Sequence, residues 1–238
     1  IGLVRAVVAG SGEEDWLSVA DLAKQHPWVL PSFGVHPWYV HAQSAQWREN
    51  LSEWLFRYPQ AGIGEIGLDR WIPDTDVPLQ VQMFREQWDI ASLMQRAATV
   101  HCLRAFGLLE EQIKSLPQSE RGFLLHSYGG PSEMLPSFAR LGAYFSVSPY
   151  FLHERKAKQW ATFAQVPLER LLIETDAPDM WPPTELNPYP LHDEQGKELN
   201  HPANITLLYD HVAKLRGMEL QELSEQVEAN YVRLFGAV

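Results

Sequence analysis

The feature that most constrains the fold is a regular alternation of short apolar runs with amphipathic segments along the whole chain. The runs are β-branched or aliphatic and nearly continuous, which is typical of strands buried on both faces. Seven such strands are expected, at residues 3–9, 28–34, 61–66, 99–103, 122–126, 143–147 and 170–175. Repeated strand–helix units predict an α/β protein with a parallel sheet, either open and doubly wound or closed as a barrel.

The intervening segments repeat their apolar residues at three- and four-residue steps, as amphipathic helices do. The clearest covers residues 77–98, and two helices are expected to close the chain at 202–216 and 219–235. No glycine- or serine-rich linker divides the alternation, so we predict a single domain over residues 1–238. The proline-rich stretch 177–201 is expected to be a long irregular loop with a role in the active site.

Composition excludes several classes of protein. No apolar run approaches the ~20 residues that span a bilayer, so an integral membrane protein is ruled out. The single cysteine, Cys102, excludes an intrachain disulfide framework and favours a reducing, cytoplasmic location. The formal net charge of −11 argues against binding nucleic acid through a broad basic surface. No segment indicates an obligate protein partner.

Ionisable residues lie at or near the carboxyl ends of four predicted strands, where βα sheets bind their ligands. They are Glu65, His101, His126 and Asp176. Each has an ordinary structural explanation by itself, such as a hydrogen-bonded histidine, a turn-forming aspartate or a buried ion pair. Together they would form one cluster of imidazole and carboxylate groups, which are the donors that divalent metals need.

Five motifs occur in the order in which one known family carries them. They are Gly-Val-His-Pro at 34–37, Gly-Glu-Ile-Gly-Leu-Asp at 64–69, Leu-His-Ser-Tyr-Gly-Gly at 125–130, Glu-Thr-Asp-Ala-Pro at 174–178 and Asn-Tyr-Val-Arg-Leu-Phe-Gly at 230–236. The chain thus resembles the TatD family of metal-dependent hydrolases over essentially its whole length. The resemblance implies a TIM-type (β/α) barrel, two divalent metal ions per subunit, and DNase or other phosphodiesterase activity.

The resemblance also implies roles for the four residues. Glu65 would bridge both metals, and His101 and His126 would hold the second. Asp176 would bind the first metal and accept a proton from the attacking water. Mixed histidine and carboxylate ligands suit zinc, manganese or magnesium, so the pattern leaves the metal open.

The chain departs from the family at its start. It begins at Ile1 without methionine, and the family's first-strand His-x-His pair is absent from the sequence. We therefore expect that the sequence lacks the family's first strand. The alternative is a shortened, catalytically compromised relative that acts as a binding protein.

Four further residues are candidates for contacting substrate. His36 and Arg104 follow strand ends and could meet a phosphate, although a structural histidine and a surface arginine are the alternatives. Trp71 and Trp181 lie on loops after the strands that carry Glu65 and Asp176, and together with Trp38–Tyr39 they would form an aromatic collar for nucleobases. The alternative is that these rings only anchor the loops.

The sequence therefore predicts a metal-dependent hydrolase of phosphodiester bonds, most plausibly a DNA exonuclease. Amide or ester hydrolysis is a second hypothesis, because metal-activated water also attacks carbonyl groups. A Cys–His dyad is rejected, since Cys102 and His101 are neighbours in a strand and their side chains point to opposite faces.

Overall fold

The computed structural model describes residues 3–236. The described chain divides into two compact units. The first takes in the chain as far as His126, residues 137–143 and the C-terminal end from Arg233. The second takes in residues 127–136 and 144–232. The single domain predicted from the sequence stays a prediction.

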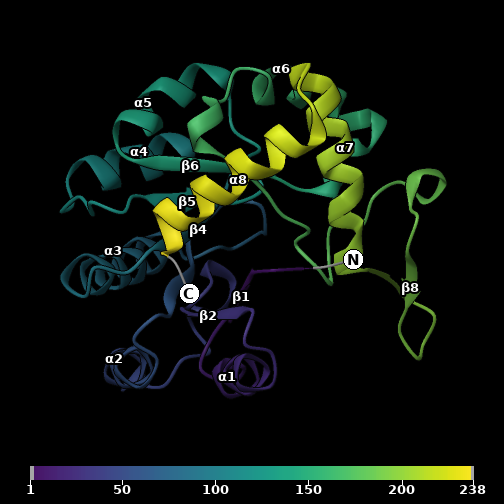
Figure 1. Cartoon of the computed structure of the whole chain (residues 1–238). Helices are drawn as coiled ribbons and strands as arrows, with labels where there is room; N and C mark the ends of the chain where they lie inside the picture. Colours follow the sequence, from purple (N-terminus) through teal and green to yellow (C-terminus); the bar gives the residue numbers. More distant parts are fainter. Residues whose placement is uncertain (1–2, 237–238) are drawn as a thin grey trace. The chain divides into compact units, whose positions relative to one another are not determined.

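The first unit is built on parallel strands that pair in chain order. The strands are β1 (Ala6–Ala9), β2 (Val29–Phe33), β3 (Gly62–Asp69), β4 (Ala98–Leu103) and β5 (Phe123–Leu125). The helices are α1 (Trp16–Gln25), η1 (Pro37–Tyr39), α2 (Trp47–Arg57), α3 (Val77–Leu93) and α4 (Phe106–Lys114). Helices α1 and α2 pack on β2 (Figure 1). Helix α3 packs on β3.

Aromatic packing holds the outer helices of this unit on the sheet. Every residue of β2 is buried. The ring of Phe33 lies 6.5 Å from that of Trp16 on α1 and 5.2 Å from that of Trp54 on α2. Full burial of one such side chain contributes about 1.5–3 kcal/mol to the free energy of unfolding. The helices are therefore fixed by their apolar faces, as the amphipathic pattern indicates.

The second unit contains the parallel pair β6 (Ala143–Val147) and β7 (Leu171–Ile173), the first residue of β6 being counted with the first unit. Its helical elements are η2 (Ser132–Met134), the beginning of α5 (Leu135–Arg140), η3 (Pro149–Leu152), η4 (Glu154–Gln159), α6 (Trp160–Phe163), η5 (Leu168–Arg170), η6 (Thr184–Leu186), η7 (Pro202–Asn204), α7 (Ile205–Arg216) and most of α8 (Leu220–Phe235). Helix α7 ends at Gly217, whose left-handed φ of 61° makes it a suitable helix terminus.

The seven predicted strands all form, and two other expectations are corrected. The helix expected over 77–98 ends at Leu93, because Gln95 adopts a left-handed φ of 53° and β4 begins at Ala98. The stretch 177–201 is not wholly irregular, since it contains the antiparallel pair β8 (Pro190–His192) and β9 (Glu198–Asn200).

A local turn explains why this hairpin forms. The carboxylate of Asp193 accepts hydrogen bonds from the backbone N–H groups of Gln195 and Lys197, and Gly196 supplies a positive φ of 80°. Aspartate and glycine at these positions are typical of turns.

Among residues 3–236, no helix is both long and apolar enough to cross a bilayer.

Candidate metal centre

Four strand ends of the first unit bring a carboxylate and three imidazoles together. Glu65 lies within β3, His101 within β4, and His36 and His126 just after β2 and β5. The pairing of β3 with β4 shifts register between Ile63 and Ile66, and an irregularity of this kind redirects the side chain that it contains. Glu65 lies inside that shift.

Close approach of β3 and β4 requires glycine beside one of the histidines. Gly67 pairs with His101 and has a φ of 150°. A Cβ atom added at this position would lie 1.9 Å from the carbonyl oxygen of His101. The motif Gly-Leu-Asp thus begins with the residue that lets the histidine strand approach the glutamate strand.

Donor atoms of His101 and Glu65 both approach one nitrogen of His126. The Nδ1 of His101 lies 3.1 Å from the Nε2 of His126. That same Nε2 lies 3.2 Å from the Oε2 of Glu65. The structure therefore joins three of the four residues predicted to bind metal.

A buried carboxylate fixes the tautomer of His101. The Oδ2 of Asp69, whose exposed fraction is 0%, lies 2.8 Å from the Nε2 of His101. An ionised carboxylate can only accept, so this contact assigns the hydrogen of the neutral ring to Nε2. The lone pair of Nδ1 is then directed toward His126. Metal-binding histidines are commonly oriented in this way by a carboxylate.

The two separations at the Nε2 of His126 fit pairs of ligands on a divalent metal. Zinc bonds of 2.0–2.1 Å in tetrahedral geometry separate two ligand atoms by about 3.3 Å. The separations of 3.1 Å and 3.2 Å around His126 are close to that value. Nitrogen and carboxylate donors are also the chemical set that zinc and manganese accept. The residues present therefore fit the metal implied by the sequence.

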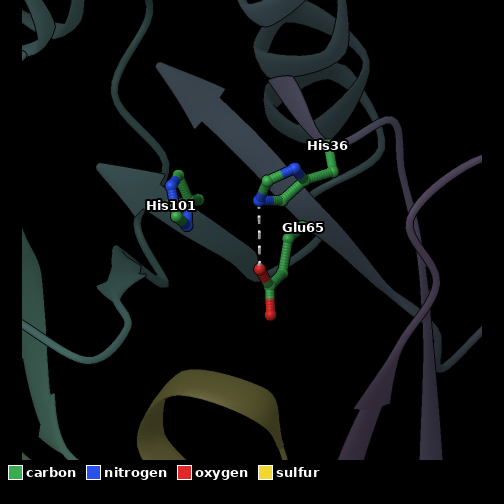
Figure 2. A group of neighbouring side chains, drawn as sticks. All are labelled: His36, Glu65 and His101. Carbon is green, nitrogen blue, oxygen red and sulfur yellow. Dashed lines mark ion pairs between the residues drawn. The ribbon is translucent and has the colours of Figure 1, made fainter. Parts of the chain in front are cut away.

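His36 lies next to this cluster as a neutral ring. Its Nδ1 accepts a hydrogen bond of 3.2 Å from the backbone N–H of Trp38, so its hydrogen lies on Nε2, 3.9 Å from the Oε2 of Glu65 (Figure 2). Burial, followed by the nearby charge of His101, lowers the pKa of His36 to about 3. His36, Glu65 and His101 also offer ligand atoms within 4.8 Å of one another.

Glu65 stays ionised at neutral pH. Burial raises its pKa, but the positive charges and hydrogen bond of the surrounding histidines, His126 foremost, outweigh burial and lower it to about 2. A carboxylate that is ionised, half-buried and bordered by imidazoles supplies the negative charge that a cation site requires.

Two of the predicted substrate residues contact each other. The guanidinium of Arg104, at the end of β4, lies 4.1 Å from the ring centroid of Trp71, after β3. The Trp71 side chain is 54% exposed and Arg104 is also exposed. They form a cation–π pair open to solvent.

The other two predicted residues of the site belong to the second unit. Asp176 follows β7 with a left-handed φ of 57°. Trp181 is half-buried, and its backbone carbonyl lies 3.2 Å from the Nε2 of His153. A role for Asp176 in the metal site and for Trp181 in an aromatic collar stays a prediction.

The contact between Asp69 and His101 was not predicted from the sequence. Strand periodicity carried a signal for it. Glu65, Gly67 and Asp69 are spaced by two residues and share one face of a strand. The pairing of Gly67 with His101 then brings this face beside His101.

Comparisons with known proteins identify the family of this chain. The family described as TatD related DNase matches residues 2–236. The chain belongs to the TatD family. The curated 3'-5' ssDNA/RNA exonuclease TatD of Citrobacter rodentium is 30% identical over 224 residues, covering 90% of this chain and 80% of that protein. An uncharacterized metal-dependent hydrolase of Escherichia coli K12, YjjV, is 27% identical and covers 98% and 87% of the two chains.

The fold of this TatD protein is also found in a solved relative. The crystal structure of YjjV from Escherichia coli K12, itself described as a TatD homolog, superposes with a TM-score of 0.87 at 26% identity, over 99% of this chain and 87% of that one. The likeness confirms the predicted α/β fold of TIM-barrel type. Membership of the family confirms the predicted class, a metal-dependent hydrolase of the DNase type.

Proposed function

We propose that this TatD protein is a metal-dependent exonuclease that hydrolyses phosphodiester bonds at the ends of single-stranded nucleic acid. The observation that carries the proposal is the approach of donor atoms on His101 and Glu65 to the Nε2 of His126, at 3.1 Å and 3.2 Å. Relatives named as single-strand exonucleases and as metal-dependent hydrolases support it.

The proposed centre uses two divalent ions, of zinc, manganese or magnesium. Glu65, His101 and His126 would hold one ion, and Glu65 with Asp176 would hold the other. When bound, such ions acidify a water molecule and neutralise charge on the phosphate. Metal binding is favoured by the ionised state of Glu65 and by the fixed tautomer of His101.

The remaining chemistry falls to side chains of the chain itself. Asp176 would accept the proton of the attacking water, as a carboxylate near neutral pH can. His36 is neutral with its hydrogen on Nε2, so it can donate a hydrogen bond to a phosphate oxygen beside Glu65. Arg104 adds a permanent positive charge near the carboxyl end of β4.

The charge of the protein favours a substrate that needs few phosphate contacts. A net charge of −11 disfavours long duplexes, whose affinity depends on neutralising many phosphates. The exposed pair of Trp71 and Arg104 offers a ring and a guanidinium instead, which suit one base and one phosphate of a strand end.

The test is hydrolysis of end-labelled oligonucleotides by protein stripped of metal and resupplied with manganese, magnesium or zinc. We expect mononucleotides from single strands, released faster than from duplexes, and no product while chelator is present. A panel of ester and amide substrates is measured in parallel. Metal-dependent turnover of that panel without cleavage of any oligonucleotide would overturn the proposal in favour of deacylation.

A further inference from the structure

Trp38 combines an exposed ring with a buried polar contact. Its side chain is 47% exposed, although it belongs to the short helix η1 directly after His36. Its indole N–H donates a hydrogen bond of 2.8 Å to the Oδ2 of Asp69. One side of the residue thus faces solvent while its nitrogen is tied to the interior.

The same carboxylate oxygen serves the candidate metal centre. The Oδ2 of Asp69 lies 2.8 Å from the Nε2 of His101 as well. The other oxygen, Oδ1, accepts a hydrogen bond of 2.6 Å from the backbone N–H of Trp71. The carboxylate is therefore oriented by three donors, of which the Trp38 side chain is one.

The Trp38 ring also lies against the histidines. It meets His36 edge to face with centroids 5.1 Å apart, and its centroid lies 6.4 Å from that of His101. Tyr39, 43% exposed, follows it in the chain, with its centroid 6.1 Å from His36. An exposed indole face this close to the donor cluster is a platform on which one flat ring can stack.

We propose that Trp38 binds the nucleobase next to the scissile phosphate and, through Asp69, positions His101 for metal binding. The inference rests on the proposed nuclease function and adds a base-binding site to it. The hydrogen bond to Asp69 fixes the indole before substrate arrives, which lowers the entropy cost of stacking. Losing that bond loosens Asp69, and hence the His101 ring.

Three variants of the full-length chain separate the two roles of Trp38. Trp38→Phe keeps an aromatic face but removes the N–H, whereas Trp38→Leu removes both. Trp28→Phe is the matched control, since Trp28 is 37% exposed but its ring lies against His26, at the opposite end of β2 from His36. Near-ultraviolet circular dichroism and thermal unfolding establish that each variant is folded.

The first measurement is the zinc dissociation constant of the metal-stripped protein, by competition with a chromophoric chelator. Loss of a group that orients a metal-binding histidine typically weakens metal binding by 10–100-fold. We expect a zinc dissociation constant about tenfold higher in both Trp38 variants and unchanged in Trp28→Phe. Wild-type zinc affinity in Trp38→Phe would overturn the positioning role.

The second measurement is the dissociation constant for a single-stranded decamer with nuclease-resistant phosphorothioate linkages, by fluorescence anisotropy, at saturating zinc. We expect binding about tenfold weaker in Trp38→Leu and little changed in Trp38→Phe, as loss of one stacked base predicts. A decamer with an abasic terminal position is expected to bind wild type and Trp38→Leu equally. A preference for the terminal base that persists in Trp38→Leu would overturn the stacking role.

Neither measurement requires turnover. A wild-type protein that binds zinc yet cleaves no oligonucleotide would contradict the proposed function, while the zinc constants would still decide the link from Trp38 to His101. Cleavage by wild type together with unchanged constants in both Trp38 variants would contradict this inference alone.

Discussion

The Nδ1 of His101 and the Nε2 of His126 face each other across 3.1 Å. Because Asp69 assigns the His101 hydrogen to Nε2, the facing Nδ1 is an acceptor. Either a proton carried by His126 or a metal ion that replaces this proton must therefore lie between the two nitrogens. The ionised oxygen of Glu65, 3.2 Å from the same nitrogen, favours the positive ion.

Replacing either of these histidines is expected to abolish binding at this site. His126→Gln removes the donor that lies within 3.2 Å of both His101 and Glu65, so we expect zinc affinity to fall by more than the roughly 100-fold that loss of an orienting group costs. The control is His41→Gln, because His41 is exposed and its ion pair is with Asp76, outside the candidate metal centre. Elemental analysis and chelator competition measure the result. Equal metal content in His126→Gln and wild type would contradict the assignment.

Asp69→Asn is expected to weaken metal binding by about 10–100-fold with little loss of fold. The amide can present an N–H group to the Nε2 of His101, which moves the ring hydrogen to Nδ1, the atom directed at the site. Asp74→Asn is the control, since Asp74 is exposed and asparagine tolerates its left-handed φ of 57°. An unchanged zinc dissociation constant in Asp69→Asn would show that Asp69 does not set the tautomer.

Trp71→Ala is expected to raise KM for single-stranded DNA about tenfold with a smaller effect on kcat. The reason is that the ring contacts Arg104 and solvent, whereas its link to Asp69 uses the backbone N–H, which alanine keeps. Steady-state kinetics on oligonucleotides give the two constants separately. A KM equal to that of wild type would reduce Trp71 to a loop anchor.

The strands and the cluster of donors were predictable because both depend on short-range pattern. Apolar runs fixed the approximate position of each strand, and parallel strands bring their carboxyl ends together, so Glu65, His101 and His126 were expected to meet. The β6 bounds 143–147 were predicted without error. The ends of most other strands differ by a few residues, because hydrogen-bond pairing rather than apolarity decides where a strand ends.

The contacts made by Asp69 were predictable only in part. Strand periodicity places Asp69 on the same face of its strand as Glu65 and Gly67. The register shift in β3 and the rotamer of Trp38, on which the hydrogen bonds depend, cannot be predicted from the sequence. The hairpin β8–β9 was not predicted from the sequence, because its strands are three residues long and the first of them is exposed. No alternation of apolar residues therefore indicates these strands.

Cys102 is expected to be dispensable for hydrolysis. Burial raises the pKa of its thiol, so it is not a thiolate at neutral pH despite following His101. We expect Cys102→Ser to retain kcat/KM within about twofold and the native thiol to resist iodoacetamide until the protein unfolds. Rapid alkylation of the folded protein with loss of activity would contradict this expectation and support a Cys102–His101 dyad.

Glu65→Gln tests the central claim most directly, because it removes the negative charge of Glu65 beside the histidines of the candidate metal centre. Metal content and hydrolysis of single-stranded DNA are measured on the same preparation, beside wild type. We expect loss of bound metal and at least about a 100-fold fall in kcat/KM, since metal stabilisation of a phosphoryl group supplies several kcal/mol. Hydrolysis at the wild-type rate by Glu65→Gln would contradict the account.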